Sequence, residues 1–465
     1  MGTVTRESPV VPSARINVVE QRSRSGHHDH TCILGVDLKI VPEILSRYCL
    51  RDLDPVVEDL VLLAGAVTYA DRIVPRRHSI AWRRELEVVV PVNNLDLWRH
   101  PGVNHHLTAT LDFLTGDTWS FVFKARKHRT VVRPQSHLPF QSKSSRVIPF
   151  SSGLDSFAVA RLTAAREPEI PLILVTTGTH INPDPSILKL PTEGSSYWVS
   201  IPFRLSQRRR VNSFREPSFR SRGFVYGVMA GIAAHLLQAD RVVIPESGQG
   251  SLGPWLQPVG GEAADVRGHP FFTGRLATLL KLVLGTNVSY QHPQLWRTKG
   301  ETLSELKELG YSDGWWLTTS CARDARHMAI DKHRVQCGVC ASCLLRRQSL
   351  FAACLDERRD CYCWTNLCAP NLAQAAASES RPTGRNDEGQ AKCAVLALED
   401  LSRATEDSRG IESAVSELSA VSGEDSNNVC AKLCRLLDAH KNEWRAFLST
   451  LGPASFINQW LSTLR

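Results

Sequence analysis

The residues with the clearest chemistry form a short polar run, Ser151-Ser152-Gly153-Leu154-Asp155-Ser156. An apolar segment at 147–150 precedes the run and a helical pattern follows it, so we expect a strand, a tight loop and a helix. In this order the N–H groups of the first helical turn, backed by the helix dipole, form a cradle for an anion. Small side chains let the main chain approach a polyphosphate closely. The run predicts a phosphate-binding loop, with an ordinary capped turn as the alternative. It is not a Walker loop, because no Lys-Ser or Lys-Thr pair follows.

A second group with evident chemistry consists of four cysteines, Cys321, Cys337, Cys340 and Cys343. Two-residue gaps separate the last three, and the fourth lies sixteen positions upstream of them. Four thiolates at this spacing suit a closed tetrahedral zinc site. An iron-sulfur cluster is the alternative, because the same ligands can hold either. A redox role for the CxxC pair is disfavoured, since a metal bound by all four cysteines leaves no resolving thiol free.

The two groups together resemble a known family. The polar run resembles the PP-loop of the ATP pyrophosphatase superfamily, Ser-Gly-Gly-x-Asp-Ser, with Ser152 in place of one glycine. A PP-loop followed by a late cysteine cluster resembles the 7-cyano-7-deazaguanine synthase (QueC) family. Three more segments match it: Glu216-Pro217-Ser218-Phe219-Arg220-Ser221-Arg222-Gly223-Phe224, Ile244-Pro245-Glu246-Ser247-Gly248 and Thr298-Lys299-Gly300-Glu301. The resemblance covers roughly residues 147 to 355, and the longer layout is similar to QatC, the QueC-like component of Qat anti-phage systems.

The resemblance implies an ATP-dependent carbon–nitrogen ligase. Such an enzyme adenylates 7-carboxy-7-deazaguanine, releases pyrophosphate and passes the acyl group to an amine. In the defence-associated relatives the implied amine is the N-terminus of a partner protein from the defence operon. In the synthase the amine is ammonia, and a second ATP converts the amide into a nitrile. The other hypotheses are a tRNA-modifying PP-loop enzyme and a nucleotide-binding scaffold without turnover.

The resemblance also assigns roles to individual residues. The expected catalytic residues are Asp155, Lys299, Arg220 and Arg222. Asp155 would organise Mg²⁺ and phosphate, and Lys299 would neutralise charge at the α-phosphate. The two arginines can clamp a carboxylate or a phosphate, with a surface ion pair as the alternative.

The same comparison places the two small-molecule substrates. Glu246 would accept hydrogen bonds from a guanine-like base beside Ser247 and Gly248, with a helix cap as the alternative for Glu246. ATP is expected at the loop and at the end of the second strand, where the contacting residues are Phe150, Ser151, Ser152, Gly153, Leu154, Asp155, Ser156, Val175 and Thr176. The implied cofactors are therefore ATP, Mg²⁺ and, at the cysteines, Zn²⁺.

These motifs need a scaffold that brings them together. Short apolar runs at 146–150, 171–175 and 241–245, separated by helical stretches, predict an α/β fold with a parallel sheet covered on both faces. The resemblance makes this the HUP-like fold of PP-loop enzymes. The site of such a sheet lies at the carboxyl ends of its strands. We assign residues 141–370 to this domain, including the four-cysteine zinc site.

Other segments flank this domain. Residues 1–31, with the cluster His27-His28-Asp29-His30, have the composition of a flexible arm. Residues 32–140 predict an α+β accessory domain with a helix start at Asp54, a strand at 84–92 and a hairpin formed by 107–113 and 119–123. Residues 371–392 predict a mobile linker and 393–465 a helical tail.

Composition limits the class of protein. Of the 465 residues, 42% are hydrophobic and 22% charged, which excludes a disordered or collagen-like chain. The sequence has no uncharged apolar run of about 18 residues and no apolar signal segment, so we expect a cytoplasmic protein without a membrane span. The net charge of +8 fits an anionic ligand such as a nucleotide. The arginines at 204–215 favour a solvated loop, so we do not expect nucleic acid as a partner, and a homodimer stays open.

Overall fold

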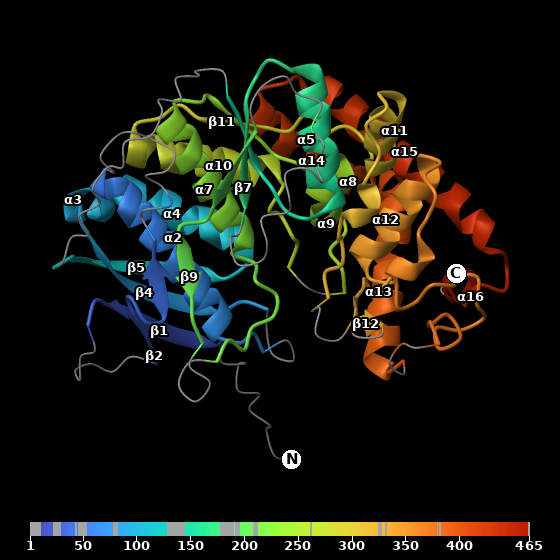
Figure 1. The fold of residues 1–465 in the computed structure, drawn as a ribbon, viewed down its shortest axis with the longest axis horizontal. Helices are drawn as coiled ribbons and strands as arrows, with labels where there is room; N and C mark the ends of the chain where they lie inside the picture. The colour runs from blue at the N-terminus through green and yellow to red at the C-terminus, as the bar shows by residue number, and fades with distance from the viewer. Residues whose placement is uncertain are drawn as a thin grey trace, which may run out of the picture.

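The computed structural model of the chain is an α/β protein built around two parallel sheets (Figure 1). It describes residues 11–21, 29–41, 44, 54–77, 82–127, 145–176, 190, 196–207, 213–260, 263–323, 328–330, 333–378, 380 and 383–463. Two histidines of the N-terminal cluster, His27 and His28, lie outside the described residues. The expected α/β class with a parallel sheet is confirmed.

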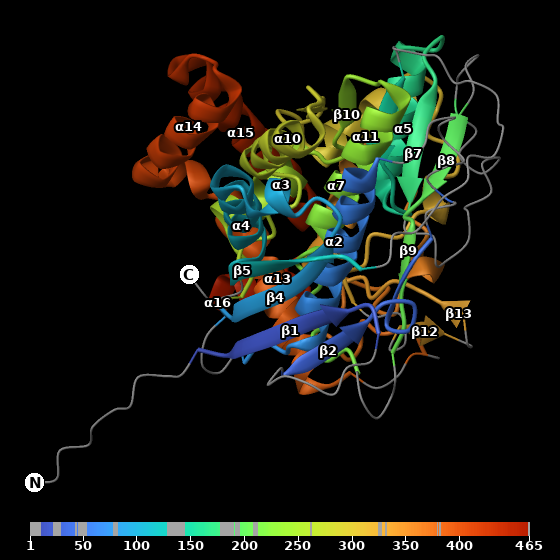
Figure 2. The same ribbon diagram turned by 90° about the vertical axis from the view of Figure 1, so that its left-hand side faces the viewer.

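The first sheet has four parallel strands in the order β2-β1-β4-β5 (Figure 2). They are β1 (Ser13–Val19), β2 (His30–Ile33), β4 (Glu85–Val92) and β5 (Thr118–Ala125). The helices between them in the chain are α2 (Pro55–Ile73), α3 (Leu95–Arg99) and α4 (Pro101–Thr115). The predicted helix start is confirmed, because the Asp54 side chain accepts a hydrogen bond from Val56 N at 2.8 Å.

Some sequence predictions for this region are wrong. Residues 107–113 lie within α4, which begins at Pro101 and ends at Thr115, and Gly116 caps its end in the left-handed conformation. Leu107 and Leu111 fit both a two-residue and a four-residue period, so alternation alone misassigned them to a strand. The predicted hairpin between 107–113 and 119–123 is therefore absent from the described residues. Strand β5, which contains 119–123, instead pairs parallel with β4, and the region is α/β instead of α+β. Strand β1 lies inside the predicted flexible arm, where it pairs with both β2 and β4.

The second sheet has five parallel strands in the order β11-β10-β6-β7-β8. They are β6 (Arg146–Pro149), β7 (Leu172–Thr176), β8 (Ser196–Ser200), β10 (Arg241–Val243) and β11 (Ser289–Gln291). Within this sheet the first strand in the sequence, β6, lies at the centre. Strands β7 and β8 follow on one side of it, and β10 and β11 follow on the other side. The strand order reverses between β6 and β10, and open α/β sheets bind ligands in the crevice at such a point.

Helices cover both faces of the second sheet. The core on one face joins Ile148 and Leu174 to side chains of α5 (Leu154–Arg166) and α11 (Lys299–Glu308). The core on the other face joins Val147 to side chains of α7 (Arg222–Leu237) and α10 (Pro270–Leu284). Successive residues of a strand point to opposite faces, so each strand contributes to both cores.

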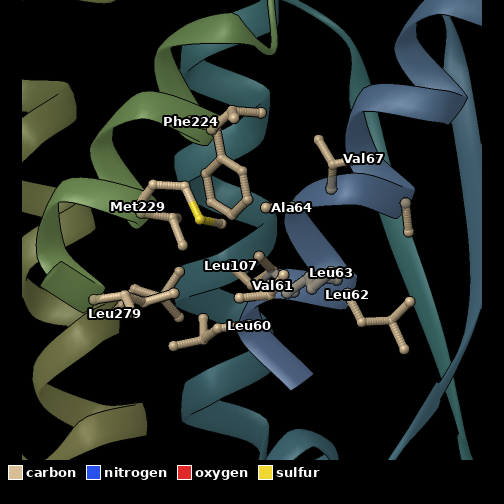
Figure 3. Close-up of a cluster of buried hydrophobic side chains, with 14 of the residues drawn as sticks. Leu60, Val61, Leu62, Leu63, Ala64, Val67, Leu107, Phe224, Met229 and Leu279 are labelled. Atoms are coloured by element: carbon tan, nitrogen blue, oxygen red, sulfur yellow. The ribbon is translucent and has the colours of Figure 1, made fainter. Parts of the chain in front are cut away.

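The N-terminal region and the second sheet share one hydrophobic core. Figure 3 shows Leu60 and Val67 of α2 in the same cluster as Phe224 and Met229 of α7 and Leu279 of α10. In addition, strand β3 (Leu38–Ile40) pairs antiparallel with β9 (Phe203–Leu205). The N-terminal region is therefore packed into the same body as the sheet that carries the predicted loop.

The helices of residues 341–463 begin within the cysteine-rich region and continue to the C-terminal end of the described chain. They are α12 (Ala341–Ala352), α13 (Arg385–Ser402), α14 (Ser408–Ser422), α15 (Ser426–Leu451) and α16 (Phe456–Thr463). Cys337 and Cys343 share a core with Val395 of α13 and Trp444 of α15. The helix α13 begins inside the segment 371–392 that was predicted as a linker, because its apolar face is buried against this core.

Short elements complete the fold. They are α8 (Gly248–Ser251), α9 (Gly253–Leu256), β12 (Ala329–Ile330), β13 (His333–Arg334) and 3-10 turns at Trp315–Leu317, Arg359–Cys361 and Ala404–Glu406. Over the described residues, the helices are all too short or too polar to cross a membrane.

Candidate functional site

A pocket lies at the carboxyl ends of β6 and β10, where the strand order of the second sheet reverses. Its polar groups come from the loop after β6, the start of α7, the end of β10 and the segment around the start of α10. These groups belong to Ser151, Ser156, Arg222, Tyr226, Glu246, Arg267 and Thr273. The pocket combines hydroxyls, guanidinium groups and one carboxyl with apolar walls, which is the usual make-up of a small-molecule site.

The predicted phosphate loop forms a tight turn at the edge of this pocket. Ser151 N donates to Ser156 Oγ at 3.3 Å, and the two hydroxyl oxygens lie 3.0 Å apart. Gly153 N donates to Ser151 Oγ at 3.2 Å. Helix α5 begins at Leu154, and among the described residues no side chain caps it. The N–H groups of its first turn are therefore available to an external acceptor such as a phosphate.

Ser152 replaces the glycine of the PP-loop pattern without backbone strain. In the described part of the chain, the non-glycine residues with positive φ are Phe219, Gln238 and Cys354. The cost of about 1–2 kcal/mol for a left-handed residue therefore does not arise at Ser152. The Ser152 carbonyl accepts from Thr319 N at 2.7 Å, which ties the loop to the segment before Cys321.

The loop and α11 meet in a largely buried ion pair. Lys299 Nζ lies 2.7 Å from Asp155 Oδ2, and the two side chains are 7% and 17% exposed. Lys299 is the first residue of α11, and a capping box formed by Thr298 and Glu301 fixes the start of that helix. Exclusion of water strengthens the attraction relative to a surface pair. The structure thus brings these two predicted catalytic residues together.

Glu246 lies in the pocket within the field of this ion pair. Burial raises the pKa of Glu246 to about 7, and the charge of Asp155 adds to that effect, while Arg267 and Lys299 oppose it. At neutral pH the Glu246 carboxyl therefore exists in both ionised and neutral forms. A pocket carboxyl with a pKa raised in this way is typical of a binding or catalytic site.

The two predicted arginines are placed differently. Arg222 lines the pocket, and its guanidinium carbon lies 5.4 Å from the centroid of the Tyr226 ring. The guanidinium carbon of Arg220 lies 4.9 Å from the centroid of the Trp82 ring, and Arg220 Nη1 is 3.8 Å from Asp265 Oδ2. Arg222 is therefore available to a ligand in the pocket, whereas Arg220 packs beside it.

Arg267 is a pocket residue that the sequence did not predict. Its Nη2 lies 2.8 Å from Asp265 Oδ2. Burial acts to raise the pKa of Asp265, but Arg267 and then Arg220 outweigh burial and lower it. The only sequence feature that could have indicated Arg267 is its position three residues before Pro270, the first residue of α10. None of the motifs described above includes this position.

A buried ion network lies next to the segment that contains Arg220 and leads to Arg222, the first residue of α7. Arg84 Nη2 lies 2.6 Å from Asp71 Oδ1 and 2.7 Å from Asp117 Oδ2, and all three side chains are fully buried. Arg76 Nη2 also lies 2.5 Å from Asp117 Oδ2. Two arginines thus pair with two aspartates in the N-terminal region.

This network reaches into the loop before α7. Arg76 N donates to Glu216 Oε2 at 2.7 Å, and Ser221 N donates to Asp71 Oδ2 at 2.8 Å. Ser221 directly precedes Arg222, the first residue of α7. The N-terminal region therefore holds the segment that presents Arg222 to the pocket.

The other predicted nucleotide contacts surround the loop. Phe150 N donates to Val175 O at 2.7 Å, so the end of β7 lies directly beside the start of the loop. Thr176 is the last residue of β7, and its hydroxyl donates to Val199 O at 3.4 Å. Leu154 is buried in the core between the sheet and α5.

Ser247 and Gly248 are not among the residues that line the pocket. The Ser247 hydroxyl accepts from Gly250 N at 3.4 Å and caps α8. Gly248 N donates to Arg297 O at 2.9 Å, and a Cβ at Gly248 would lie 2.5 Å from the Leu436 side chain. Both residues therefore support the end of β10 and leave Glu246 as the ligand-facing group of this segment.

The four predicted metal ligands come together in one cluster. The Sγ atoms of Cys321, Cys337, Cys340 and Cys343 all lie within 4.8 Å of one another. The Sγ atoms of Cys337 and Cys343 are 3.7 Å apart. Zn–S bonds of about 2.3 Å in a tetrahedron give an S–S separation of about 3.8 Å, so the donor set fits zinc.

The surroundings of the cluster also suit a cation. Gly338 has a φ of +90°, and a Cβ there would lie 2.6 Å from Trp364 O, so glycine is required for the turn between the first two CxxC ligands. A hydrogen bond with Cys337 lowers the pKa of Cys321, while a hydrogen bond with Cys321 raises the pKa of Cys340 well above its usual value. The thiols cannot all ionise together unless a cation neutralises them.

No protein-family model matches this chain, and no curated protein matches it.

Proposed function

We propose that this chain is an ATP-dependent ligase that adenylates 7-carboxy-7-deazaguanine and transfers the acyl group to an amine. The observation that carries the proposal is that two features meet at the pocket that contains Arg222 and Glu246. They are the start of α5, which no described side chain caps, and the Asp155–Lys299 ion pair. One region thereby offers donors for a polyphosphate, a cation for a reacting phosphate, and groups for a carboxylate and a base. The four-cysteine cluster adds support, because it accompanies a PP-loop in the QueC-like family that the sequence resembles.

We assign the second sheet to the HUP-like PP-loop fold. The strand order around β6, and a small polar loop directly after that strand, support this assignment. The triphosphate of ATP would lie at residues 151–156, with the adenine towards Val175 and Thr176 at the end of β7. The zinc ion would be structural, because four cysteines leave no coordination position for a substrate.

The proposed reaction has two steps. A carboxylate oxygen of the deazaguanine attacks the α-phosphorus of ATP, the bond from that phosphorus to the bridging oxygen breaks, and pyrophosphate leaves. The amine then attacks the acyl carbon, the bond to the AMP oxygen breaks, and the nitrogen loses a proton. Asp155 would hold Mg²⁺ beside the phosphates of ATP, as the resemblance to PP-loop enzymes implies. Bound Mg²⁺ supplies charge neutralisation at the phosphates.

Each residue of the candidate site has a separate role in the proposed reaction. The N–H groups at the start of α5 bind the leaving pyrophosphate, and Lys299 neutralises charge at the α-phosphate. Arg222 binds the substrate carboxylate, and the ionised form of Glu246 accepts hydrogen bonds from the N–H groups of the base. Arg220 orients the wall of the pocket through Asp265.

A direct assay tests the proposal. We expect pyrophosphate and AMP to form when the protein is incubated with ATP, 7-carboxy-7-deazaguanine and an amine. Asp155→Asn is expected to lower the rate about 100-fold or more, whereas Asp96→Asn, an exposed position on α3, keeps it. Free nitrile made from ammonium would instead identify a synthase. ATP binding without pyrophosphate release would identify a scaffold.

We further propose that the acceptor amine belongs to a partner protein from a defence operon. The similarity of the chain layout to QatC supports this part of the proposal. Co-expression with the neighbouring genes, followed by intact-mass measurement of each product, tests it. A mass increase equal to one acylated deazaguanine on a partner is expected, and unmodified partners beside free amide product would contradict it.

A further inference from the structure

The long helix α15 packs beside the short helix α8 and the cysteine-bearing helix α12 (Figure 1). Two side chains of α15 make hydrogen bonds near the start of α11. Glu443 bonds to Thr298, and His440 bonds to Gln249, which in turn bonds to Lys299 N. Lys299, which pairs with Asp155, is the first residue of α11. The tail is thus in hydrogen-bonded contact with the segment that presents this lysine.

Glu443 accepts a hydrogen bond from Thr298, the residue that caps the start of α11. The Thr298 hydroxyl accepts from Glu301 N at 3.0 Å and donates its own proton to Glu443 Oε1. A Cβ on Gly300 would lie 2.5 Å from Glu443 Oε1, so the glycine at the second helical position makes room for the carboxyl group. Glu443 therefore contacts the cap one residue before Lys299.

His440 reaches the main chain of Lys299 through one glutamine. Lys299 N donates to Gln249 Oε1 at 2.8 Å, which turns the Gln249 NH₂ group towards His440 Nδ1, also at 2.8 Å. His440 Nε2 then donates to Leu398 O at 3.1 Å. Burial lowers the pKa of His440 to about 4, so the ring is neutral at pH 7, with Nδ1 as an acceptor. In this tautomer every hydrogen bond between Lys299 N, Gln249, His440 and Leu398 O has one donor and one acceptor.

An exposed ion pair joins the same two helices but contributes little. Arg435 of α15 pairs with Glu301 of α11, and the two side chains are 52% and 26% exposed. Solvent screening makes such a pair weak. The buried hydrogen bonds are more consequential, because losing one partner leaves a buried polar group unpaired.

We propose that His440 and Glu443 are positioning residues for Lys299. Helix α15 would then be required for the activity of the candidate site. This inference rests on the proposed function, in which Lys299 neutralises charge on ATP. The ion pair with Asp155 needs the first turn of α11 to be held in place. His440, through Gln249, holds the main chain of that turn, and Glu443 holds its cap.

The expected effect on rate follows from geometry. A displacement of about 1 Å in a catalytic group can lower a rate by roughly 100-fold. Glu443→Ala removes the acceptor of the Thr298 hydroxyl, and His440→Ala leaves the Gln249 amide free to turn away from Lys299 N. Either change loosens the first turn of α11 without touching a substrate.

The experiment compares four variants with the wild-type chain. His440→Ala and Glu443→Ala remove the contacts, and Glu443→Gln restores an acceptor for Thr298. Trp444→Phe is the matched control, because Trp444 is buried on the same helix but donates to Glu399 of α13. The readouts are kcat and KM for ATP in pyrophosphate release, and hydrogen exchange of the segment 298–308 measured by mass spectrometry.

We expect both alanine variants to lower kcat by about 10- to 100-fold with a smaller change in KM. Exchange in 298–308 should accelerate in these variants only, and Glu443→Gln should recover most of the rate. An equal loss of kcat in Trp444→Phe, or unchanged exchange in the alanine variants, overturns the inference. If the wild-type chain releases no pyrophosphate, the proposed function fails. The exchange data then decide by themselves whether α15 holds the start of α11.

Discussion

Replacing Arg84 with methionine is expected to destabilise the protein by about 3–5 kcal/mol at pH 7. The Arg84 side chain is fully buried, and its guanidinium donates to Asp71 and Asp117 at 2.6–3.1 Å. Methionine fills a similar length without a charge. The two carboxylates would stay buried, with Arg76 as the remaining cation near them. The magnitude follows because breaking a buried ion pair leaves an uncompensated charge out of contact with water.

The pH dependence separates this cause from a loss of packing. Burial acts to raise the pKa of Asp71, but Arg84 and then Arg76 outweigh burial and lower it. A carboxyl with a lowered pKa stabilises the fold above its unfolded pKa, and this stabilisation is lost as the pH falls. Arg84 is the largest contribution that lowers the pKa of Asp71, so we expect this pKa to rise when Arg84 is removed. Protonation then relieves the buried charge, so the deficit of Arg84→Met relative to wild type shrinks from pH 7 to pH 5.

Urea unfolding followed by tryptophan fluorescence at both pH values measures this deficit. Arg403→Met is the control, because Arg403 pairs with Glu406 and the two side chains are 53% and 54% exposed. That change is expected to stay within about 0.5 kcal/mol. A deficit for Arg84→Met below about 1 kcal/mol, or one that is equal at pH 7 and pH 5, would refute the reasoning.

Lys299→Met is expected to lower kcat for pyrophosphate release about 100-fold, measured by a coupled phosphate assay, and an unchanged rate would remove Lys299 from the site. Because the pKa of Glu246 is about 7 and its ionised form would bind the base, substrate affinity measured by calorimetry should rise about tenfold from pH 6 to pH 8. Glu246→Gln should abolish that rise, and a rise that persists in this variant contradicts the assigned role. Cys343→Ser should lose bound zinc in elemental analysis and unfold at a lower temperature, while Cys368→Ser, an exposed position, keeps both. Equal zinc content in the two variants would argue against the four-cysteine site.

Local patterns in the sequence predicted several features of the fold and of the candidate site. The loop at 151–156 and the start of α2 at Asp54 are closed by hydrogen bonds between residues two to five positions apart. The CxxC spacing of the cysteines acts over a similarly short range. Where two periods coincided, as at Leu107 and Leu111, local pattern was insufficient, and burial of one helical face determined α4.

The remaining contacts of the site join residues that are far apart in the chain. Arg76 and Glu216 are separated by 140 positions, and Gln249 and His440 by 191. Buried polar groups must find partners, but many arginines and carboxylates in this sequence could serve, and packing selects among them. The sequence by itself therefore determined the loop, the cysteine cluster and the parallel α/β class, because short-range geometry and apolar periodicity specify them. The tertiary structure alone decided that Arg267 enters the pocket, that the N-terminal network holds the start of α7, and that the C-terminal helix supports Lys299.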